Sequence, residues 1–306
     1  MNYLIESEKN LIDSFFKDYR NDPLTIYGTS SFLEDNFFIN TLQSTKYDLI
    51  FESNLNFEEH IKTVETVPLN PGGMIIIENV LRDTVYIRRL RPIIHQFSDY
   101  YFVTLRKGKV LVLVKGGAEP IFKNRNKMTI ITPSYRIKNL QKIKESMNFE
   151  YIHEWIIVYD GTKIENGFTF FSDTPKIKEY VFKGSGLSGN PQRNFALDHV
   201  TEPNTLLYFL DDDNIVHPDL FRFMNTIIVQ KIMYTFNQKN RLLGNKIIPG
   251  FIDTACILID YGLCKDIRWD LEKITADGIY ITDCYNHNKE SYCYVNNNLC
   301  YYNKLS

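Results

Sequence analysis

Residues 205–214 read TLLYFLDDDN, a run of apolar and β-favouring residues that ends abruptly in three carboxylates and an amide. Such a run is typical of a buried strand in an α/β sheet, and these sheets bind ligands at the carboxyl ends of their strands. Asp211, Asp212 and Asp213 repel one another, so a bound divalent cation is the simplest reason to keep them together. The alternative is a solvated acidic turn that caps the next helix.

Further strand-like runs lie on both sides of this stretch and alternate with helical patterns. We expect strands at residues 128–132, 154–160, 176–182, 205–211 and 255–260. Helical spacing of apolar residues is found around 137–147, 191–200 and 218–231. This alternation predicts an α/β domain over residues 128–306 whose sheet carries the acidic run.

An earlier group of short apolar runs predicts a second, smaller α/β domain. The runs occupy residues 24–28, 47–51, 73–78, 100–105 and 109–114. Only three residues separate the last two runs, which predicts an antiparallel hairpin at the end of the sheet. The following stretch is polar, contains glycine and proline and lacks an apolar period, which favours a linker. We therefore expect a small domain at 1–118, a linker at 119–127 and the larger domain at 128–306.

The composition argues against several classes of function. The chain of 306 residues has 35 basic and 37 acidic side chains, a formal net charge of −2, so no broad cationic surface is available for nucleic acid. The first residues carry charges throughout, unlike a secretory signal, and no stretch approaches the ~20 apolar residues of a membrane span. The five cysteines form no CxxC pair, so we expect reduced thiols and no zinc. The prediction is a cytoplasmic protein.

Three more motifs lie at expected strand ends or helix starts of the larger domain. They are TPSYR (132–136), WIIVYD (155–160) and PQRNFAL (191–197), and YFLDDDN (208–214) follows them. In this order the motifs resemble those of the inverting GT-A glycosyltransferases, particularly the glucuronyltransferase family (family 43). The resemblance covers most of residues 128–260. It implies a GT-A fold, a UDP-sugar donor such as UDP-glucuronate, and a Mn2+ or Mg2+ ion.

The resemblance assigns three residues to the nucleotide. Thr132 and Tyr135 would lie beside it, with Tyr135 stacked on the uracil ring, and Asp160 would accept a hydrogen bond from the base. From the residues alone, a half-buried core tyrosine and a turn-forming aspartate before Gly161 are the alternatives.

The same resemblance assigns four residues to the rest of the donor. Arg193 would contact the donor, Asp211 and Asp212 would hold the ribose and nearby groups, and Asp213 would ligate the metal. A solvated arginine in the first turn of a helix is the alternative for Arg193. A basic group at a helix N-terminus is unfavourable without an anion nearby, and this favours a ligand there.

The acceptor side rests on two aspartates. Asp253, in the segment PGFIDTA (249–255), resembles an acceptor contact of the family. Inverting transfer needs a carboxylate that removes the acceptor's hydroxyl proton, and Asp277 lies at about the expected distance downstream. The family usually has glutamate there, and a helix N-cap or turn is the alternative role. The tail around residues 298–303 also lacks the family's histidine, which leaves the donor sugar open.

Residues 46–80 resemble the second half of a class I methyltransferase sheet. Gly28 is the only relic of a glycine-rich loop after the first strand, which is too little to indicate S-adenosylmethionine binding. We expect a degenerate Rossmann-like scaffold or docking domain without its own catalytic role.

The sequence thus predicts a metal-dependent inverting glycosyltransferase that moves a sugar from a UDP-sugar to a hydroxyl of a glycan acceptor. Surface polysaccharide synthesis such as capsule assembly fits such an enzyme, acting in the cytoplasm or at the inner face of the membrane, with peripheral association with a glycan-assembly complex. Two rivals remain: a nucleotidyltransferase, and a non-catalytic saccharide-binding protein on the same scaffold.

Overall fold

The computed structural model places part of the chain. The described residues are 26–28, 47–52, 57–66, 68–77, 89, 92–94, 96–97, 99–105, 108–115, 127–164, 168–171, 173–224 and 232–305. The chain divides into two compact units, one of residues 1–124 with 225–230 and one of residues 125–224 with 231–306. The linker predicted at 119–127 lies outside the described residues except for Lys127.

The second unit is built on a mixed sheet that carries the acidic run. Its strands are β6 (Met128–Ser134), β7 (Ile152–Asp160), β8 (Ile177–Phe182), β9 (Leu206–Phe209), β10 (Met233–Gln238), β11 (Ile257–Asp260) and β12 (Tyr292–Cys300). They lie in the order β12-β10-β11-β9-β6-β7-β8. The pairs between β9, β6, β7 and β8 are parallel, whereas β11 runs antiparallel to both of its neighbours. The predicted α/β class is confirmed.

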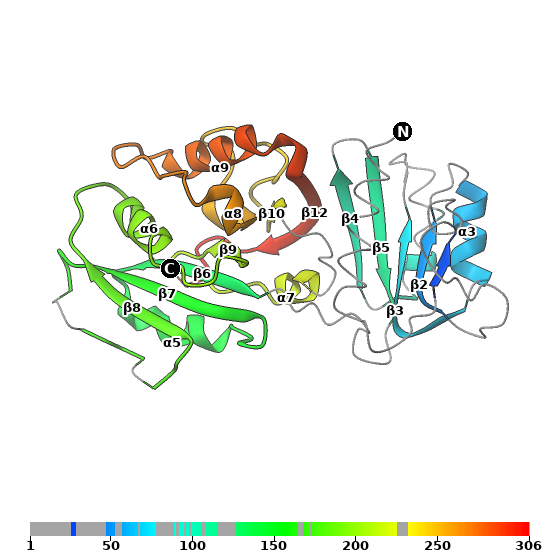
Figure 1. Cartoon of the computed structure of the whole chain (residues 1–306), viewed down its shortest axis with the longest axis horizontal. Coiled ribbons are helices and arrows are strands. Elements are labelled where there is room, and N and C mark those ends of the chain that lie inside the picture. Colours follow the sequence, from blue (N-terminus) through cyan, green and yellow to red (C-terminus); the bar gives the residue numbers. More distant parts are fainter. Residues whose placement is uncertain are drawn as a thin grey trace. The chain divides into compact units, whose positions relative to one another are not determined.

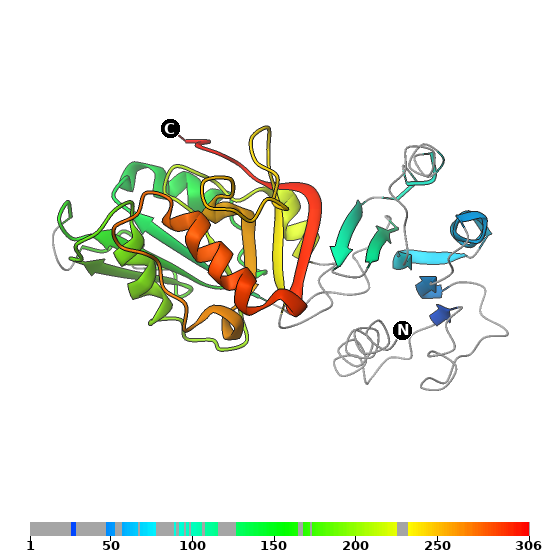
Figure 2. The same ribbon diagram turned by 90° about the horizontal axis from the view of Figure 1, so that it is seen from above.

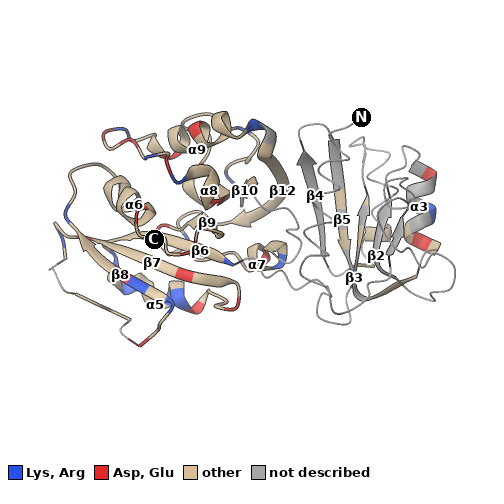
Figure 3. Cartoon of the chain, in the orientation of Figure 1, with Lys and Arg blue, Asp and Glu red and all other residues tan. Residues whose placement is uncertain are grey.

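Helices cover both faces of this sheet. They are α5 (Ile137–Glu145), α6 (Asn190–Leu197), α7 (Pro218–Met224), α8 (Tyr261–Cys264) and α9 (Ala276–His287), with short 3-10 turns at Thr254–Cys256 and Lys289–Ser291. Figure 1 shows α6, α8 and α9 on one face and α5 and α7 on the other. The strand β9 is buried along its whole length, as a strand covered on both faces requires. Charged side chains lie on the outer helices, as α5 shows with Lys142 and Lys144 (Figure 3).

Four elements of this unit were not among the expected strands and helices, namely β10, β12, α8 and α9. The strand β10 is buried throughout although it contains Asn237 and Gln238, and Asn237 Oδ1 accepts hydrogen bonds from Gly244 N and Tyr294 Oη. The helix α9 has β-branched and aromatic residues that hide a helical period. These hydrogen bonds hold the polar residue of β10 inside the sheet, and in α9 the ring of Tyr280 stacks on Trp269.

The first unit is a smaller α/β sheet. Its elements are β1 (Ile26–Gly28), β2 (Tyr47–Glu52), α3 (Phe57–Thr66), β3 (Leu69–Ile77), β4 (Asp99–Leu105) and β5 (Gly108–Val114). The order is β1-β2-β3-β5-β4, in which the first three strands are parallel and β5 is antiparallel to β3 and β4. The predicted hairpin is confirmed, since Leu105 pairs with Gly108. Among the described helices, none is long and apolar enough to cross a membrane.

Candidate active site

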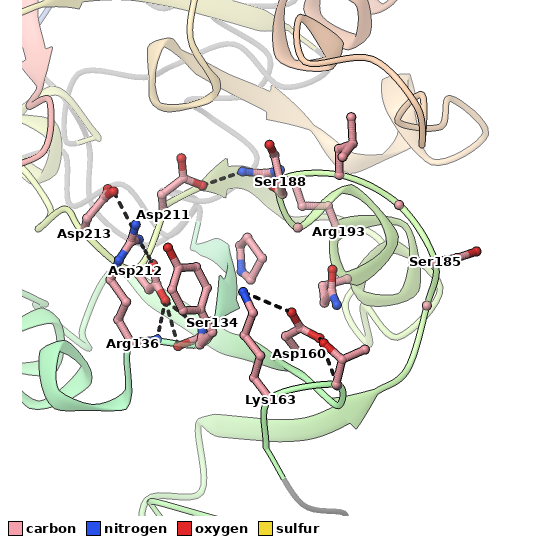
Figure 4. Close-up of a pocket in the computed structure, with 18 residues that line it drawn as sticks. Ser134, Arg136, Asp160, Lys163, Ser185, Ser188, Arg193, Asp211, Asp212 and Asp213 are labelled. Atoms are coloured by element: carbon pink, nitrogen blue, oxygen red, sulfur yellow. Dashed lines mark hydrogen bonds and ion pairs between the residues drawn. The ribbon is translucent and has the colours of Figure 1, made fainter.

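The predicted motifs meet at one edge of the second unit's sheet. The strands β9, β6 and β7 are parallel neighbours, so their carboxyl ends carry Asp211, Ser134 and Asp160 to the same side. A pocket of about 590 Å³ lies there, lined by the turn after β6, the end of β7, the loop before α6 and the three aspartates. Figure 4 shows these side chains around the opening. This is where open α/β sheets bind ligands.

Asp212 fastens the turn after β6 to the end of β9. Its Oδ2 accepts hydrogen bonds from Tyr135 N (2.8 Å), Arg136 N (2.7 Å) and Ser134 Oγ (3.3 Å), and its Oδ1 accepts one from Arg136 Nη1 (2.5 Å). The residue is 2% exposed. Both oxygens are therefore engaged by the turn after β6, although Asp212 also lines the pocket, and the ribose contact implied by the resemblance stays a prediction.

Asp211 supplies the anion that Arg193 needs. The guanidinium Nη2 lies 2.5 Å from Asp211 Oδ1, and Nη1 donates to Ser188 O and to Asn190 Oδ1. Arg193 is 2% exposed and lies 4.7 Å over the ring of Trp269. Burial alone would lower its pKa, but Asp211 and the more distant Asp277 and Asp253 raise it above the ordinary value. Arg193 thus carries a fixed positive charge at the start of α6, beside the pocket.

Asp213 is held by fewer partners than Asp212. Among the described side chains its carboxylate contacts Arg136, whose Nη1 lies 3.2 Å from Oδ2. Burial and the Asp211 carboxylate raise the pKa of Asp213, and the Arg136 guanidinium opposes this rise. Electrostatic repulsion between these carboxylates is therefore only partly relieved within the chain.

The acids fit a hard cation that shares its coordination with a ligand. No group of three or more His, Cys, Asp or Glu side chains among the described residues is arranged to hold a metal by itself. Mg2+ characteristically binds through one or two carboxylates together with phosphate oxygens and water. Asp211 and Asp213 beside the pocket match that requirement, whereas Asp212, engaged by its own donors, does not.

The two residues predicted to hold the base both line the pocket. The ring of Tyr135 is 46% exposed, and Lys163 Nζ lies 3.8 Å from its centroid. Asp160 Oδ1 accepts hydrogen bonds from Thr162 N and Oγ1, while Oδ2 lies 3.5 Å from Lys163 Nζ. Burial would raise the pKa of Asp160, but the Thr162 hydrogen bonds and Lys163 lower it. Asp160 is thus a turn-forming residue and a pocket residue at once.

Thr132 lies in the core. It is fully buried, and its hydroxyl accepts a hydrogen bond from Trp155 Nε1 at 2.9 Å. It does not line the pocket. The side chains of the TPSYR motif therefore face two ways: Thr132 lies in the core, whereas Ser134, Tyr135 and Arg136 line the pocket.

Asp277 lies in the first turn of α9, close enough for the charges of Arg193 and Asp211 to act on its pKa. Burial raises its pKa from 3.8 to about 7, with Asp211 and Asp253 adding to the rise and Arg193 and Arg241 opposing it. The helix N-cap is Thr275, so the alternative of Asp277 as an N-cap is wrong. None of the described residues donates a hydrogen bond to the Asp277 carboxylate. Its environment is that of a proton acceptor near neutral pH.

Both carboxylate oxygens of Asp253 are engaged. Its Oδ1 accepts a hydrogen bond from Ala255 N at the start of the 3-10 turn, and its Oδ2 pairs with Arg241 Nη1 at 2.9 Å. The side chain is half-buried. Neither Asp253 nor Asp277 lines the pocket, although the charge of Asp253 helps to raise the pKa of Asp277.

Three basic residues and a loop of this site were not predicted from the sequence. Arg136, Lys163 and Arg241 each pair with a predicted aspartate. The loop GSGLSG (184–189) lines the pocket and leads into α6. Its signal was glycine spacing before a helix start, which is typical of anion-binding loops. Gly189 has φ 77°, and a Cβ there would lie 2.7 Å from Pro133 Cβ, so only glycine fits.

Among known proteins, similarity to this chain is found at the level of solved structures. No protein-family model matches the chain, and neither does any curated protein. Solved structures of S. aureus TarS are similar to part of it: TarS 1-349 (TM-score 0.45, 16% identity), TarS (0.42, 15%) and TarS 1-349 in complex with UDP (0.43, 15%). Each match covers 57% of this chain, and 60%, 36% and 60% of the respective TarS chains. Similarity at this level assigns no function, and the resemblance to family 43 stays a prediction.

Proposed function

We propose that the second unit is a GT-A-type glycosyltransferase that moves a sugar from a nucleotide-sugar, a UDP-sugar, to a hydroxyl of a glycan acceptor with inversion. The observation that carries this proposal is the pocket at the carboxyl ends of β6, β7 and β9, which is lined by Tyr135, Asp160 and the three aspartates. Asp277 does not line it, but burial and the charges of Asp211 and Asp253 raise its pKa to about 7. A proton acceptor on one side of a site and acids suited to a cation on the other are what inverting transfer requires.

The donor side would be held by the strand ends. The exposed ring of Tyr135 would stack on the base, and Asp160 would bind its polar edge from the end of β7. Asp211 and Asp213 would hold Mn2+ or Mg2+, which when bound would neutralise charge on the departing diphosphate. Arg193 keeps Asp211 in position, and its buried positive charge adds to the field at the same place.

The acceptor side would supply the proton transfer. Because burial raises the pKa of Asp277 to about 7, the residue would take the proton of an attacking hydroxyl near neutral pH. Arg193 and Arg241 keep the charged form accessible despite burial. Asp253, held by Arg241, would orient the acceptor.

A nucleotide and metal screen tests the proposal. Melting temperatures are measured with UDP, GDP, CDP and dTDP, each with Mn2+, with Mg2+ and with chelator, for the wild type and Asp213→Ala. We expect stabilisation by UDP that needs metal and is lost in Asp213→Ala, because a ligand of the native state raises its stability. Metal-dependent UDP binding retained in Asp213→Ala would overturn the assignment of the metal ligand.

Product analysis separates the reaction from its rivals. Incubation with a UDP-sugar panel and acceptors should release UDP together with a glycoside. Release of pyrophosphate would indicate a nucleotidyltransferase instead, and acceptor binding without turnover across the panel would indicate a saccharide-binding protein.

The wider assignments stay predictions. They are a non-catalytic scaffold role for the N-terminal unit, a cytoplasmic site of action and a place in surface polysaccharide assembly. Deleting residues 1–118 and measuring turnover on a soluble acceptor would test the first of these, because a scaffold unit should be dispensable for chemistry.

A further inference from the structure

Exposed apolar side chains gather on one side of the second unit. Nine large hydrophobic residues of the described part of the chain are exposed. Seven of them belong to the loop after β10, the segment before α9, the loop before α6 and the C-terminal tail. We call these seven the apolar rim: Leu187, Leu243, Ile248, Phe251, Leu271, Ile274 and Tyr302. Three are more than half exposed, namely Ile248 at 55%, Phe251 at 54% and Ile274 at 82%.

These four segments lie side by side. Leu187 N donates a hydrogen bond to Leu271 O at 2.9 Å. Gly278 packs so closely on the loop after β10 that an added Cβ would lie 2.5 Å from Pro249 Cα. The Arg241 guanidinium lies 3.5 Å from the ring centroid of Tyr302. Figure 2 shows the red C-terminal tail passing the base of the yellow loop after β10. The four segments are therefore neighbours, and they include the loop of Asp253 and adjoin the first turn of α9, which carries Asp277; Leu187 also lines the pocket.

The charge of this surface has one sign along its longest segment. Residues 239–251, KNRLLGNKIIPGF, contain Lys239, Arg241 and Lys246 and no acidic residue, although the whole chain has a net charge of −2. Arg241 is paired with Asp253, which leaves Lys239 and Lys246 as exposed cations next to Leu243, Ile248 and Phe251. Large exposed apolar patches rimmed by polar groups mark interaction surfaces.

We propose that the apolar rim docks on the surface of an anionic phospholipid bilayer. Its apolar side chains would enter the boundary between headgroups and acyl chains, and Lys239 and Lys246 would meet lipid phosphates. Tyr302 suits this boundary because its hydroxyl can stay in water while the ring is buried, and the phenyl ring of Phe251 adds apolar area. Docking would turn the acceptor side of the site toward the bilayer, so the acceptor hydroxyl would be presented there. That last step rests on the proposed function, whereas the docking itself does not.

Vesicle flotation of the full chain tests the docking. We expect the wild type to float with vesicles of phosphatidylcholine that contain a third phosphatidylglycerol, and to remain unbound with phosphatidylcholine alone. High salt should weaken binding because it screens the basic residues. The double variant Ile248→Ser/Phe251→Ser should bind about tenfold more weakly, since it lacks two apolar side chains that would enter the bilayer. Lys239→Gln/Lys246→Gln should reduce binding to anionic vesicles by a similar factor.

A matched control and two other outcomes decide the result. Phe170→Ser removes a phenyl ring that is 41% exposed outside the rim, and it should bind vesicles as the wild type does. A wild type that does not float, or rim variants that float equally well, would overturn the proposal. A dimer in solution that Ile248→Ser/Phe251→Ser dissociates would overturn it in favour of a second copy of the chain. The UDP melting shift, measured in the same samples, reports separately on the proposed function.

Discussion

Two aspartates of the same site differ in what surrounds them. Asp212 is 2% exposed, and four hydrogen bonds from residues 134–136 occupy both of its oxygens. Asp277 is half-buried, receives no hydrogen bond from the described residues, and has a pKa of about 7. The first carboxylate is held by donors that the fold brings to it, and the second is desolvated without such donors. Hydrogen-bonded carboxylates stabilise structure, whereas desolvated ones are available for proton transfer.

The largest expected effect is on the chemistry at Asp277. Asp277→Asn removes the proton acceptor and should lower kcat by about 1,000-fold, within the range usual for general bases. The UDP melting shift with Mn2+ should remain, because the variant leaves Asp211 and Asp213 in place. Steady-state kinetics with a UDP-sugar check this. Wild-type turnover by the Asp277→Asn variant would remove Asp277 from the mechanism.

A matched pair of substitutions in the acidic run distinguishes a carboxylate that stabilises the fold from one that does not. Asp212→Asn places an amide against backbone N-H groups and should lower the free energy of unfolding by about 3 kcal/mol. Asp213→Asn should change it by less than about 1 kcal/mol, because its Arg136 partner is 3.2 Å away and its raised pKa shows that the fold does not favour its charge. Urea unfolding measures both. Equal losses would show that Asp213 is as structural as Asp212.

The raised pKa of Asp277 also predicts a pH effect on stability. The folded-state value of about 7 lies above the unfolded value near 3.8, so the folded protein binds the proton more tightly. Its free energy of unfolding therefore falls as the pH rises from about 4 to 7 through this group. At pH 8 Asp277→Asn should be about 2 kcal/mol more stable than the wild type, less than the ~4 kcal/mol of the full pKa difference because the amide must find partners.

Comparison at low pH provides the control. At pH 4 both proteins have a neutral side chain at this position when folded, so the advantage of Asp277→Asn is lost and the cost of the amide remains, which should make the variant about 2 kcal/mol less stable than the wild type. The same group predicts that kcat/KM of the wild type falls below about pH 7, as the base becomes protonated. A stability difference between the two proteins that does not vary with pH would contradict the assigned pKa.

The smallest expected effect concerns Thr132. Thr132→Val removes the hydrogen-bond acceptor of the buried Trp155 Nε1 and should cost about 1 kcal/mol of stability. UDP affinity should not change, because Thr132 does not line the pocket. Urea unfolding and UDP titration by calorimetry measure the two quantities. If the binding free energy of UDP falls by more than the free energy of unfolding, Thr132 would be assigned to the nucleotide site.

Most of the sheet could be predicted because its strands carry local signals. The runs that became β6, β7 and β9 are continuous and apolar, as strands buried on both faces require. The hairpin of β4 and β5 was visible from its short loop. β10 was missed because it contains Asn237 and Gln238, and Asn237 finds its hydrogen-bond partners at Gly244 and Tyr294. α9 was missed because its β-branched and aromatic residues hide a helical period, and the ring of Tyr280 stacks on Trp269 outside the helix.

The sequence by itself determined that a buried strand ends in three acids, and that Tyr135, Asp160 and Arg193 follow or precede strands whose ends meet. Those features are local, since apolar runs and turn residues act over a few positions. Only the tertiary structure decided which acid does what. The donors to Asp212 lie 76 to 78 residues away, and the charges that act on Asp277 come from β9, α6 and the loop after β10. Burial and electrostatic interaction depend on distance in space, and the chain order does not contain that distance.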